Sequence, residues 1–239
     1  MVTSSAIGIV CKAPRPGETK TRLAAVIGGE AAAKASACFL RDLGSCIEQI
    51  PPQIGRAGYA VYSPAGAELE LGALLPPSFS LLLQSDANLG NVLFGATSEL
   101  LSRGHDCVLL VNGDSPTLPS RFLTDAIERL RRPGDRMVLG PASDGGYYLI
   151  GLKYPHQALF SGIPWGTGQV ASVTLKRAKQ SAIEYELLPE WYDVDDAQTF
   201  QCLKEELAHR STRFVGGGAA PTTREWLDNF EAAAGSPKP

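Results

Sequence analysis

Apolar and polar positions change their spacing several times along this chain, and these changes define its elements. Short continuous apolar runs end in glycine, proline, asparagine or aspartate, a pattern typical of strands that are buried on both faces. Between them, apolar residues return every three or four positions, which is typical of amphipathic helices. The apolar runs predict strands at Ala6–Cys11, Ala57–Tyr62, Ser80–Leu83, Cys107–Val111, Met137–Leu139, Tyr147–Gly151 and Glu184–Leu188.

The helical spacing predicts helices over 29–50, 67–75, 89–102, 119–131, 167–180 and 196–209. Strands that alternate with helices predict an α/β fold, here a three-layer α/β/α arrangement with a mostly parallel sheet. We assign residues 1–212 to this domain. The tail, residues 213–239, is rich in glycine, alanine and proline apart from an amphipathic turn at Arg224–Phe230. We expect it to be an appendage or partly disordered.

Composition narrows the class of protein. The chain has 239 residues, 44% of them apolar, which is enough for one sizeable core. Its net charge of −3 argues against a nucleic-acid partner. The five cysteines form no Cys-x-x-Cys pair and predict reduced, buried thiols. No apolar run has the length of a membrane span and the first residues do not resemble a signal peptide, so we expect a cytoplasmic protein without a membrane partner.

A cationic segment, residues 12–23, follows the first strand of a chain that is acidic overall. Ligands of open α/β sheets bind beyond the carboxyl ends of the strands. Cations and backbone N–H groups there suit an oligophosphate, although a solvated basic loop would have the same composition. The segment does not contain a Walker A motif. Its four cations are Lys12, Arg15, Lys20 and Arg22. Gly17 shapes the loop, and Gly17 and Thr21 are further candidates for substrate binding.

Two further turns follow strands. Asp114 comes directly after the 107–111 strand and is a candidate Mg²⁺ ligand, or else a residue that forms the turn or caps the next helix. Asp144, Gly145 and Gly146 follow the 137–139 strand, where the glycines let the backbone approach a ligand, and Asp-Gly also predicts a hairpin. Trp165 lies in a later loop and either stacks on a base or sugar or anchors the core.

The segment after the 184–188 strand contains three aspartates. Alternation along an extended segment places Asp193 and Asp195 on the same side, while Asp196 is positioned to cap the last helix. Asp193 or Asp195 would then meet Asp114 opposite the cationic segment, forming a Mg²⁺–phosphate site. The chain has no Gly-x-Ser-x-Gly elbow and its three histidines lie in unsuggestive contexts, so acyl-transfer triads and histidine metal sites are poorly supported.

Five motifs, "KAPRPGETKTRL", "GDSPTLP", "DGGYYLIGL", "IPWGT" and "YDVDD", occur in an order that resembles the bacterial DUF2064 family. Its members are also described as transferase 1 associated with radical-SAM and selenodomain proteins, or as arsenosugar-type glycosyltransferases. The resemblance spans about residues 6–209 and implies the nucleotide-diphospho-sugar transferase (GT-A) fold. The chain is also similar to phospholactate guanylyltransferases and molybdenum-cofactor-type nucleotidyltransferases, which share the cationic loop and the Asp-Val-Asp segment.

The resemblance implies roles for individual residues. Lys12, Lys20 and Arg22 would hold the phosphates. Asp114, completed by Asp193 or Asp195, would hold Mg²⁺ or Mn²⁺. The chain departs from the family at 87–93, where Gly-Asp-Leu-Gly-Glu-Arg-Met is usual and "ANLGNVL" stands here. This departure affects the acceptor contacts or the activity of that loop, in which Asn88 and Gly90 are our candidate substrate ligands.

Three functions follow from these residues. Nucleotidyl transfer, in which an NTP reacts with a small phosphorylated acceptor and pyrophosphate leaves, best explains so cationic a loop, with Lys20, Arg22, Asp114 and Asp144 as catalytic candidates. Glycosyl transfer from a nucleotide-sugar is the alternative, with Asp144 as the acceptor base. A nucleotide-binding module that has lost catalysis is the third. All three predict a nucleotide partner, and the first two a small-molecule acceptor.

Overall fold

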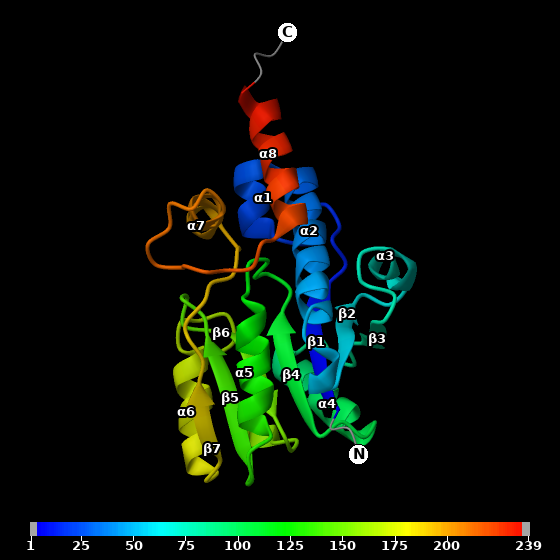
Figure 1. Ribbon diagram of the computed structural model, residues 1–239, viewed down its shortest axis with the longest axis vertical. Helices are drawn as coiled ribbons and strands as arrows, with labels where there is room; N and C mark the ends of the chain where they lie inside the picture. Colours follow the sequence, from blue (N-terminus) through cyan, green and yellow to red (C-terminus); the bar gives the residue numbers. More distant parts are fainter. Residues whose placement is uncertain (1–3, 236–239) are drawn as a thin grey trace.

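The computed structural model describes residues 4–235 and has a single seven-stranded sheet (Figure 1). The strand order is β3-β2-β1-β4-β6-β5-β7; β6 runs antiparallel to β4 and β5, and the other neighbouring strands are parallel. The predicted mostly parallel α/β sheet is therefore confirmed. The strands are β1 (Ser5–Lys12), β2 (Arg56–Ser63), β3 (Ser80–Leu83), β4 (Cys107–Asn112), β5 (Arg136–Pro141), β6 (Tyr147–Leu152) and β7 (Glu184–Leu187).

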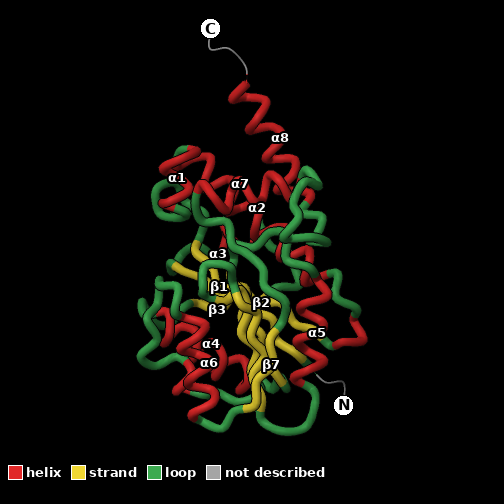
Figure 2. The backbone as a smooth tube through the Cα atoms, turned by 90° about the vertical axis from the view of Figure 1, so that its left-hand side faces the viewer, coloured by secondary structure: helices red, strands yellow, loops and turns green. Residues whose placement is uncertain are grey.

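Helices cover both faces of the sheet, as Figure 2 shows with the strands between α5 on one side and α4 and α6 on the other. Alternate residues of β4 therefore enter different cores. Leu109 packs in the core beneath α2 and α5, and Leu110 packs in the core beneath α4. This arrangement explains why the strand is a continuous apolar run. The helices are α1 (Thr21–Ile27), α2 (Gly29–Glu48), α3 (Glu68–Gly72), α4 (Leu89–Ser102), α5 (Ser120–Leu130), α6 (Val170–Gln180), α7 (Ala197–Leu207) and α8 (Pro221–Gly235), with short 3-10 turns at Pro52–Ile54 and Gln157–Leu159.

Two differences from the sequence predictions affect the site. Helix α1 was not predicted, and it begins inside the cationic segment, at Thr21. Helix α6 starts at Val170 and not at 167. The reason is that the preceding loop packs tightly on the β5–β6 hairpin, where a Cβ atom on Gly145 would overlap the Gly168 backbone. The hairpin predicted at Asp144-Gly145 is confirmed, since Ala142 N donates to Gly146 O at 3.0 Å and Gly145 has a φ of 89°.

The C-terminal helix α8 packs against α2 above the sheet (Figure 1). Its first N–H groups come from Thr222 and Thr223, which donate to the buried Asp42 carboxylate of α2 at 3.0 and 2.7 Å. A side chain of a distant element thus satisfies the free donors of this helix end. The division of the chain at residue 212 stays a prediction, and residues 236–239 of the predicted tail lie outside the described residues. Over residues 4–235, no helix is long and apolar enough to cross a lipid bilayer.

Candidate active site

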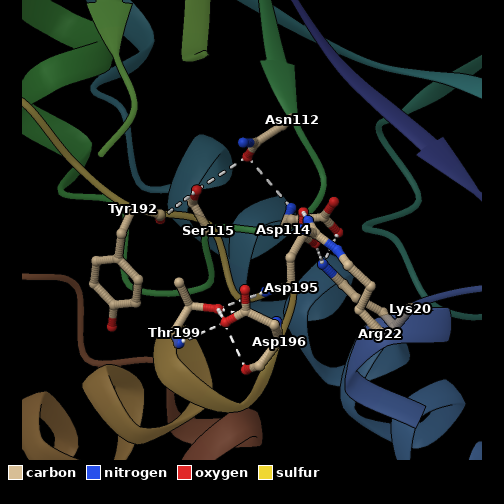
Figure 3. A network of polar contacts seen from close by, with 9 residues as sticks. All are labelled: Lys20, Arg22, Asn112, Asp114, Ser115, Tyr192, Asp195, Asp196 and Thr199. Carbon is tan, nitrogen blue, oxygen red and sulfur yellow. Dashed lines mark hydrogen bonds and ion pairs between the residues drawn. The ribbon is translucent and has the colours of Figure 1, made fainter. Parts of the chain in front are cut away.

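Asp114 is held at the carboxyl end of β4 by its neighbours in sequence. The side-chain oxygen of Asn112 accepts from the Asp114 N–H at 3.3 Å and lies 3.0 Å from the Ser115 hydroxyl, closing a local turn (Figure 3). A Cβ atom on Gly113 would lie 3.2 Å from Cys11 Cβ and from a methyl group of Leu40, so the turn passes close against β1. The absence of a side chain at 113 therefore lets Asp114 emerge next to the end of the first strand.

Lys20 joins Asp114 to the segment that follows β7. Its Nζ lies 2.6 Å from Asp114 Oδ1 and 2.8 Å from Asp195 Oδ1, and its side chain is only 3% exposed. Arg22 Nη2 lies 3.1 Å from the other oxygen of Asp195 (Figure 3). The backbone supports this junction, because Val194 N donates to Asp114 O at 2.9 Å. Three segments far apart in the sequence thus share one charged cluster, which we call the junction: Lys20, Arg22, Asp114 and Asp195.

The backbone at Lys20 is unusual. Its φ of 53° and ψ of 43° are left-handed, a conformation that residues other than glycine seldom adopt and that often occurs at functional sites. Burial of the ammonium opposes its charge, but the Asp114 and Asp195 carboxylates outweigh burial and raise the pKa of Lys20. Lys20 therefore remains a cation at the centre of the junction.

Asp193 lies beside the junction, and its pKa is shifted from the ordinary value of an aspartate. Burial, and then the charges of Asp195, Asp144 and Asp114, raise its pKa from 3.8 to about 7. Asp193 therefore lies within electrostatic reach of three other carboxylates. Asp196 is used differently, since its carboxylate accepts from Thr199 N at 3.0 Å and caps α7, as the sequence predicted.

Two of the junction residues, Asp114 and Asp195, have the chemistry of ligands for a divalent cation. Asp114 and Asp195 each turn one carboxylate oxygen to the point that the Lys20 ammonium fills, and carboxylate oxygens together with substrate phosphates are the ligands that Mg²⁺ takes. Within residues 4–235, however, no group of three or more His, Cys, Asp or Glu side chains is arranged as a metal site. Lys20 supplies the positive charge between the two carboxylates in this structure, and the metal assignment stays a prediction.

Two adjoining cavities meet at the junction, and we call them the first and second lobes of one cleft. The first lobe, of about 560 Å³, includes Lys12, Thr21, Gln84 and Ala87 in its lining. The second lobe, of about 810 Å³, is bounded by the β5–β6 hairpin, the 165–168 loop and Asp193. The residues common to both lobes are Val10, Arg22, Leu89, Asp114 and Asp195.

The structure brings most of the predicted site residues to this cleft. The first lobe contains Lys12, Lys20, Thr21, Arg22, Asp114 and Asp195, and the second contains Asp144, Gly146, Trp165 and Asp193 together with Arg22, Asp114 and Asp195. Lys12, Lys20 and Arg22 therefore converge on one concave site with Asp114, as predicted. Their individual roles in binding and catalysis stay predictions.

Other predicted site residues lie outside both linings. Arg15 pairs with Glu70 of α3 at 3.1 Å, and Gly17 makes a turn with a φ of 78°. Asn88 is the N-cap of α4, where its side-chain oxygen accepts from the N–H groups of Gly90 and Asn91 at 2.9 and 3.3 Å. A Cβ atom on Gly90 would overlap the carbonyl oxygen of Phe160, so this glycine serves close packing beside Trp165. Gly145 likewise serves the hairpin.

Several lining residues were not predicted from the sequence. Gln84 follows β3, and its amide donates to the carbonyls of Cys11 and Val61 at 3.1 and 2.9 Å. Tyr147 makes an edge-on contact with Trp165, with 6.2 Å between ring centroids, and its buried hydroxyl has no hydrogen-bond partner among the described residues. Gln84 could have been predicted, because it directly follows a strand, as Lys12 and Asp114 do in the predicted pattern. Tyr147 has no such signal, because it is an aromatic residue within a predicted strand.

The sequence profile of the family described as "Uncharacterized protein conserved in bacteria (DUF2064)" matches residues 53–167. This range includes the motifs "GDSPTLP", "DGGYYLIGL" and "IPWGT" and confirms the predicted family resemblance. No curated protein matches the sequence.

Solved structures of several transferases have a similar fold. A candidate nucleotide-diphospho-sugar transferase from Desulfovibrio desulfuricans G20 is 27% identical, with a TM-score of 0.81 over 96% of this chain and 98% of that one. CMP:2-keto-3-deoxy-manno-octonic acid synthetase complexed with CTP is 10% identical, with a TM-score of 0.58 over 87% of this chain and all of that one. Glucosyl-3-phosphoglycerate synthase from Mycobacterium tuberculosis, with Mn²⁺ and UDP, is 10% identical, with a TM-score of 0.51 over 99% of this chain and 81% of that one.

Proposed function

We propose that this chain is a metal-dependent transferase that binds a nucleotide in the first lobe and a second substrate in the second lobe. The observation that carries the proposal is the junction, where Lys20 Nζ lies within 2.8 Å of a carboxylate oxygen of both Asp114 and Asp195 at the boundary of the two lobes. A group transferred from one substrate to the other has to pass this boundary, and charge stabilisation is most effective there.

The first lobe suits the phosphates of the nucleotide. Lys12 at the end of β1 is exposed, and Arg22 keeps 67% of its side chain accessible, so both are open to an anionic ligand. Leu89, which is 42% exposed, offers apolar surface in the same lobe. A CTP-bound neighbour of the same fold supports a nucleotide as the ligand.

We place nucleotidyl transfer first among the reactions. An acceptor oxygen attacks the α-phosphorus, the bond from that phosphorus to the bridging oxygen breaks, and pyrophosphate leaves with the electron pair. Lys12 and Arg22 neutralise the charge of the leaving group, and Asp144 or Asp193 in the second lobe accepts the acceptor proton. When bound by Asp114 and Asp195, Mg²⁺ would neutralise further phosphate charge.

Glycosyl transfer is the second candidate function. The similarity to the Desulfovibrio protein, which extends over nearly the whole of both chains, favours it. In that reaction the acceptor oxygen attacks the anomeric carbon of a nucleotide-sugar, the bond from this carbon to the diphosphate breaks, and the nucleoside diphosphate leaves. Asp144 would accept the acceptor proton.

The test separates these two functions from a binding module without catalysis. The protein is incubated with Mg²⁺ and CTP, GTP or UTP, with pyrophosphate as the readout, and in parallel with UDP-glucose or GDP-mannose, with nucleoside diphosphate as the readout. Pyrophosphate release supports the first reaction and nucleoside diphosphate release supports the second. Nucleotide binding without either product would leave a non-catalytic module, and no binding of any nucleotide would contradict the proposal.

A further inference from the structure

The second lobe differs from the first in its charge. It contains four carboxylates, Asp114, Asp144, Asp193 and Asp195, and among its described lining residues the one cation is Arg22. Arg22 is already paired with Asp195 at 3.1 Å. Lys20 and Arg22 compensate the charges of Asp114 and Asp195, whereas Asp144 and Asp193 form no ion pair among the described residues. A phosphate group placed beside these two side chains would find no cation that is free to bind it and would face the charge of Asp144.

The backbone of the second lobe does not offset this repulsion. The N-terminus of α6 lies at its wall, and free N–H groups there would attract a phosphate. These groups are already engaged: Gln169 N donates to the Thr167 hydroxyl at 3.3 Å, Val170 N to Thr167 O at 3.4 Å, and Ala171 N to Gly145 O at 2.9 Å. The protein itself thus occupies three of the N–H groups with which a helix end usually binds an anion.

The remaining groups of the second lobe are hydrogen-bond acceptors beside apolar surface, and they suit a ligand with hydroxyl groups and an apolar face. The ionised carboxylate of Asp144 only accepts hydrogen bonds and therefore requires O–H or N–H partners, and the carboxyl group of Asp193 can hydrogen-bond a hydroxyl group whether it is protonated or not. Asp144 is exposed at the hairpin, and one of its oxygens already accepts from Gly146 N at 2.8 Å. Trp165, Tyr147 and Leu93 supply aromatic and aliphatic surface in the same lobe.

We infer that the second substrate is an uncharged polyol or sugar that presents hydroxyl groups to Asp144 and Asp193 and a ring or carbon face to Trp165. The inference rests on the proposed function only in taking the second lobe as a substrate site, and it replaces the phosphorylated acceptor predicted from the sequence. For either reaction, the nucleophile would be a hydroxyl oxygen and not a phosphate oxygen.

The test compares matched pairs of ligands. Saturation-transfer difference NMR titrations measure the dissociation constants of glucose, mannose and glycerol against those of glucose 6-phosphate, mannose 6-phosphate and glycerol 3-phosphate. The titrations are run with and without Mg²⁺ and CTP. We expect each uncharged member to bind at least about tenfold more tightly than its phosphorylated partner, which corresponds to 1.4 kcal/mol.

Two variants connect the preference to the residues. Asp144→Asn keeps an oxygen for Gly146 N but removes a charge, so the preference for the uncharged member should fall severalfold. Asp228→Asn removes an exposed carboxylate of α8, outside both lobes, and should leave the preference unchanged. If the phosphorylated members bind equally or more tightly, if no member of the panel binds, or if Asp144→Asn leaves the preference unchanged, the inference is wrong.

The two proposals fail in different ways. A protein that binds CTP or another nucleotide but prefers phosphorylated ligands would overturn the inference and leave the proposed function standing. A protein that binds no nucleotide but still prefers uncharged sugars would overturn the proposed function and leave the ligand class of the second lobe standing.

Discussion

The two lobes of the cleft are built in different ways from the same sheet. In the first lobe, one continuous segment that starts at the last residue of β1 contributes Lys12, Lys20 and Arg22, so its cationic character is already visible in the sequence. The second lobe collects Asp144, Trp165 and Asp193 from separate connections and combines carboxylates with aromatic surface. This difference is the basis of our proposal that an anionic substrate binds on one side of the junction and an uncharged one on the other.

The largest expected effect comes from a substitution at the junction, which both lobes share. Asp114→Asn keeps the shape of the turn but removes one of the two carboxylates that hold Lys20 and would hold a metal. We expect turnover to fall about a hundred- to a thousandfold, the range found when a charge-stabilising group is lost. Initial rates at saturating Mg²⁺ and nucleotide give this ratio. Thermal unfolding should show a folded variant, and wild-type activity would remove Asp114 from the mechanism.

A substitution of Lys20 tests whether nucleotide binding in the first lobe depends on a cation that is already paired with two carboxylates. Lys20→Met removes the charge between Asp114 and Asp195, and nucleotide affinity should fall about ten- to a hundredfold, as expected for a charge-assisted contact of about 1.5–3 kcal/mol. The unpaired carboxylates should also lower the melting temperature. Calorimetric titration of CTP, GTP and UDP-glucose measures the affinity.

Lys34→Ala provides the matched control, because Lys34 is exposed on α2 and does not line the first lobe. If Lys20→Met binds nucleotides as tightly as this control does, Lys20 serves the structure of the junction and not the ligand. A loss for UDP-glucose much smaller than that for CTP would indicate that a triphosphate is the natural ligand.

Trp165 tests the second lobe alone. Trp165→Ala removes an aromatic face, and the KM of the second substrate should rise about tenfold, since aromatic contacts contribute about 0.5–1.5 kcal/mol beyond burial. Nucleotide affinity should stay within twofold, because Trp165 does not line the first lobe. Steady-state kinetics with glucose or mannose, together with nucleotide titration, separate the two effects. An equal loss of nucleotide affinity would mean that the two lobes are not independent.

The smallest expected effect is on the pH dependence of stability, and it comes from a buried carboxyl group, Glu206. Glu206 of α7 accepts from the Tyr192 and Thr117 hydroxyls, so it joins the segments that lead to Asp193 and follow Asp114. Burial raises the pKa of Glu206 above its ordinary 4.5, although the two hydrogen bonds oppose the shift. The raised pKa means that the folded protein binds the Glu206 proton more tightly than the unfolded chain does.

This contribution to stability is complete below pH 4.5 and is lost as pH rises through the folded-state pKa. The wild-type unfolding midpoint in urea should therefore fall as pH rises above 4.5, relative to Glu206→Gln, which has no charge to bury. Urea titrations at several pH values measure the difference. Parallel pH profiles for the two proteins would contradict the prediction.

Much of the fold could be predicted because its signals are local. Buried strands, helical periodicity and the cap formed by Asp196 depend on residues a few positions apart, and the structure has them within a few residues of the predicted bounds. The rule that ligands bind at the carboxyl ends of parallel strands also located Lys12, Asp114 and Asp144 at the cleft. Helix α1 escaped prediction because it is short and begins at a lysine with left-handed backbone, without a side-chain cap.

The sequence by itself determined the α/β order, the family resemblance and the cationic and acidic strand ends, since each depends on neighbouring residues. Only the tertiary structure decided how the charges pair. Lys20 meets Asp195 across 175 positions of sequence, Arg15 turns away to Glu70, and Asn88 caps a helix. Ion pairs and hydrogen bonds form wherever burial brings complementary groups within about 3 Å, and no local pattern encodes that distance. The contrast between the two lobes therefore arises from packing and not from any single motif.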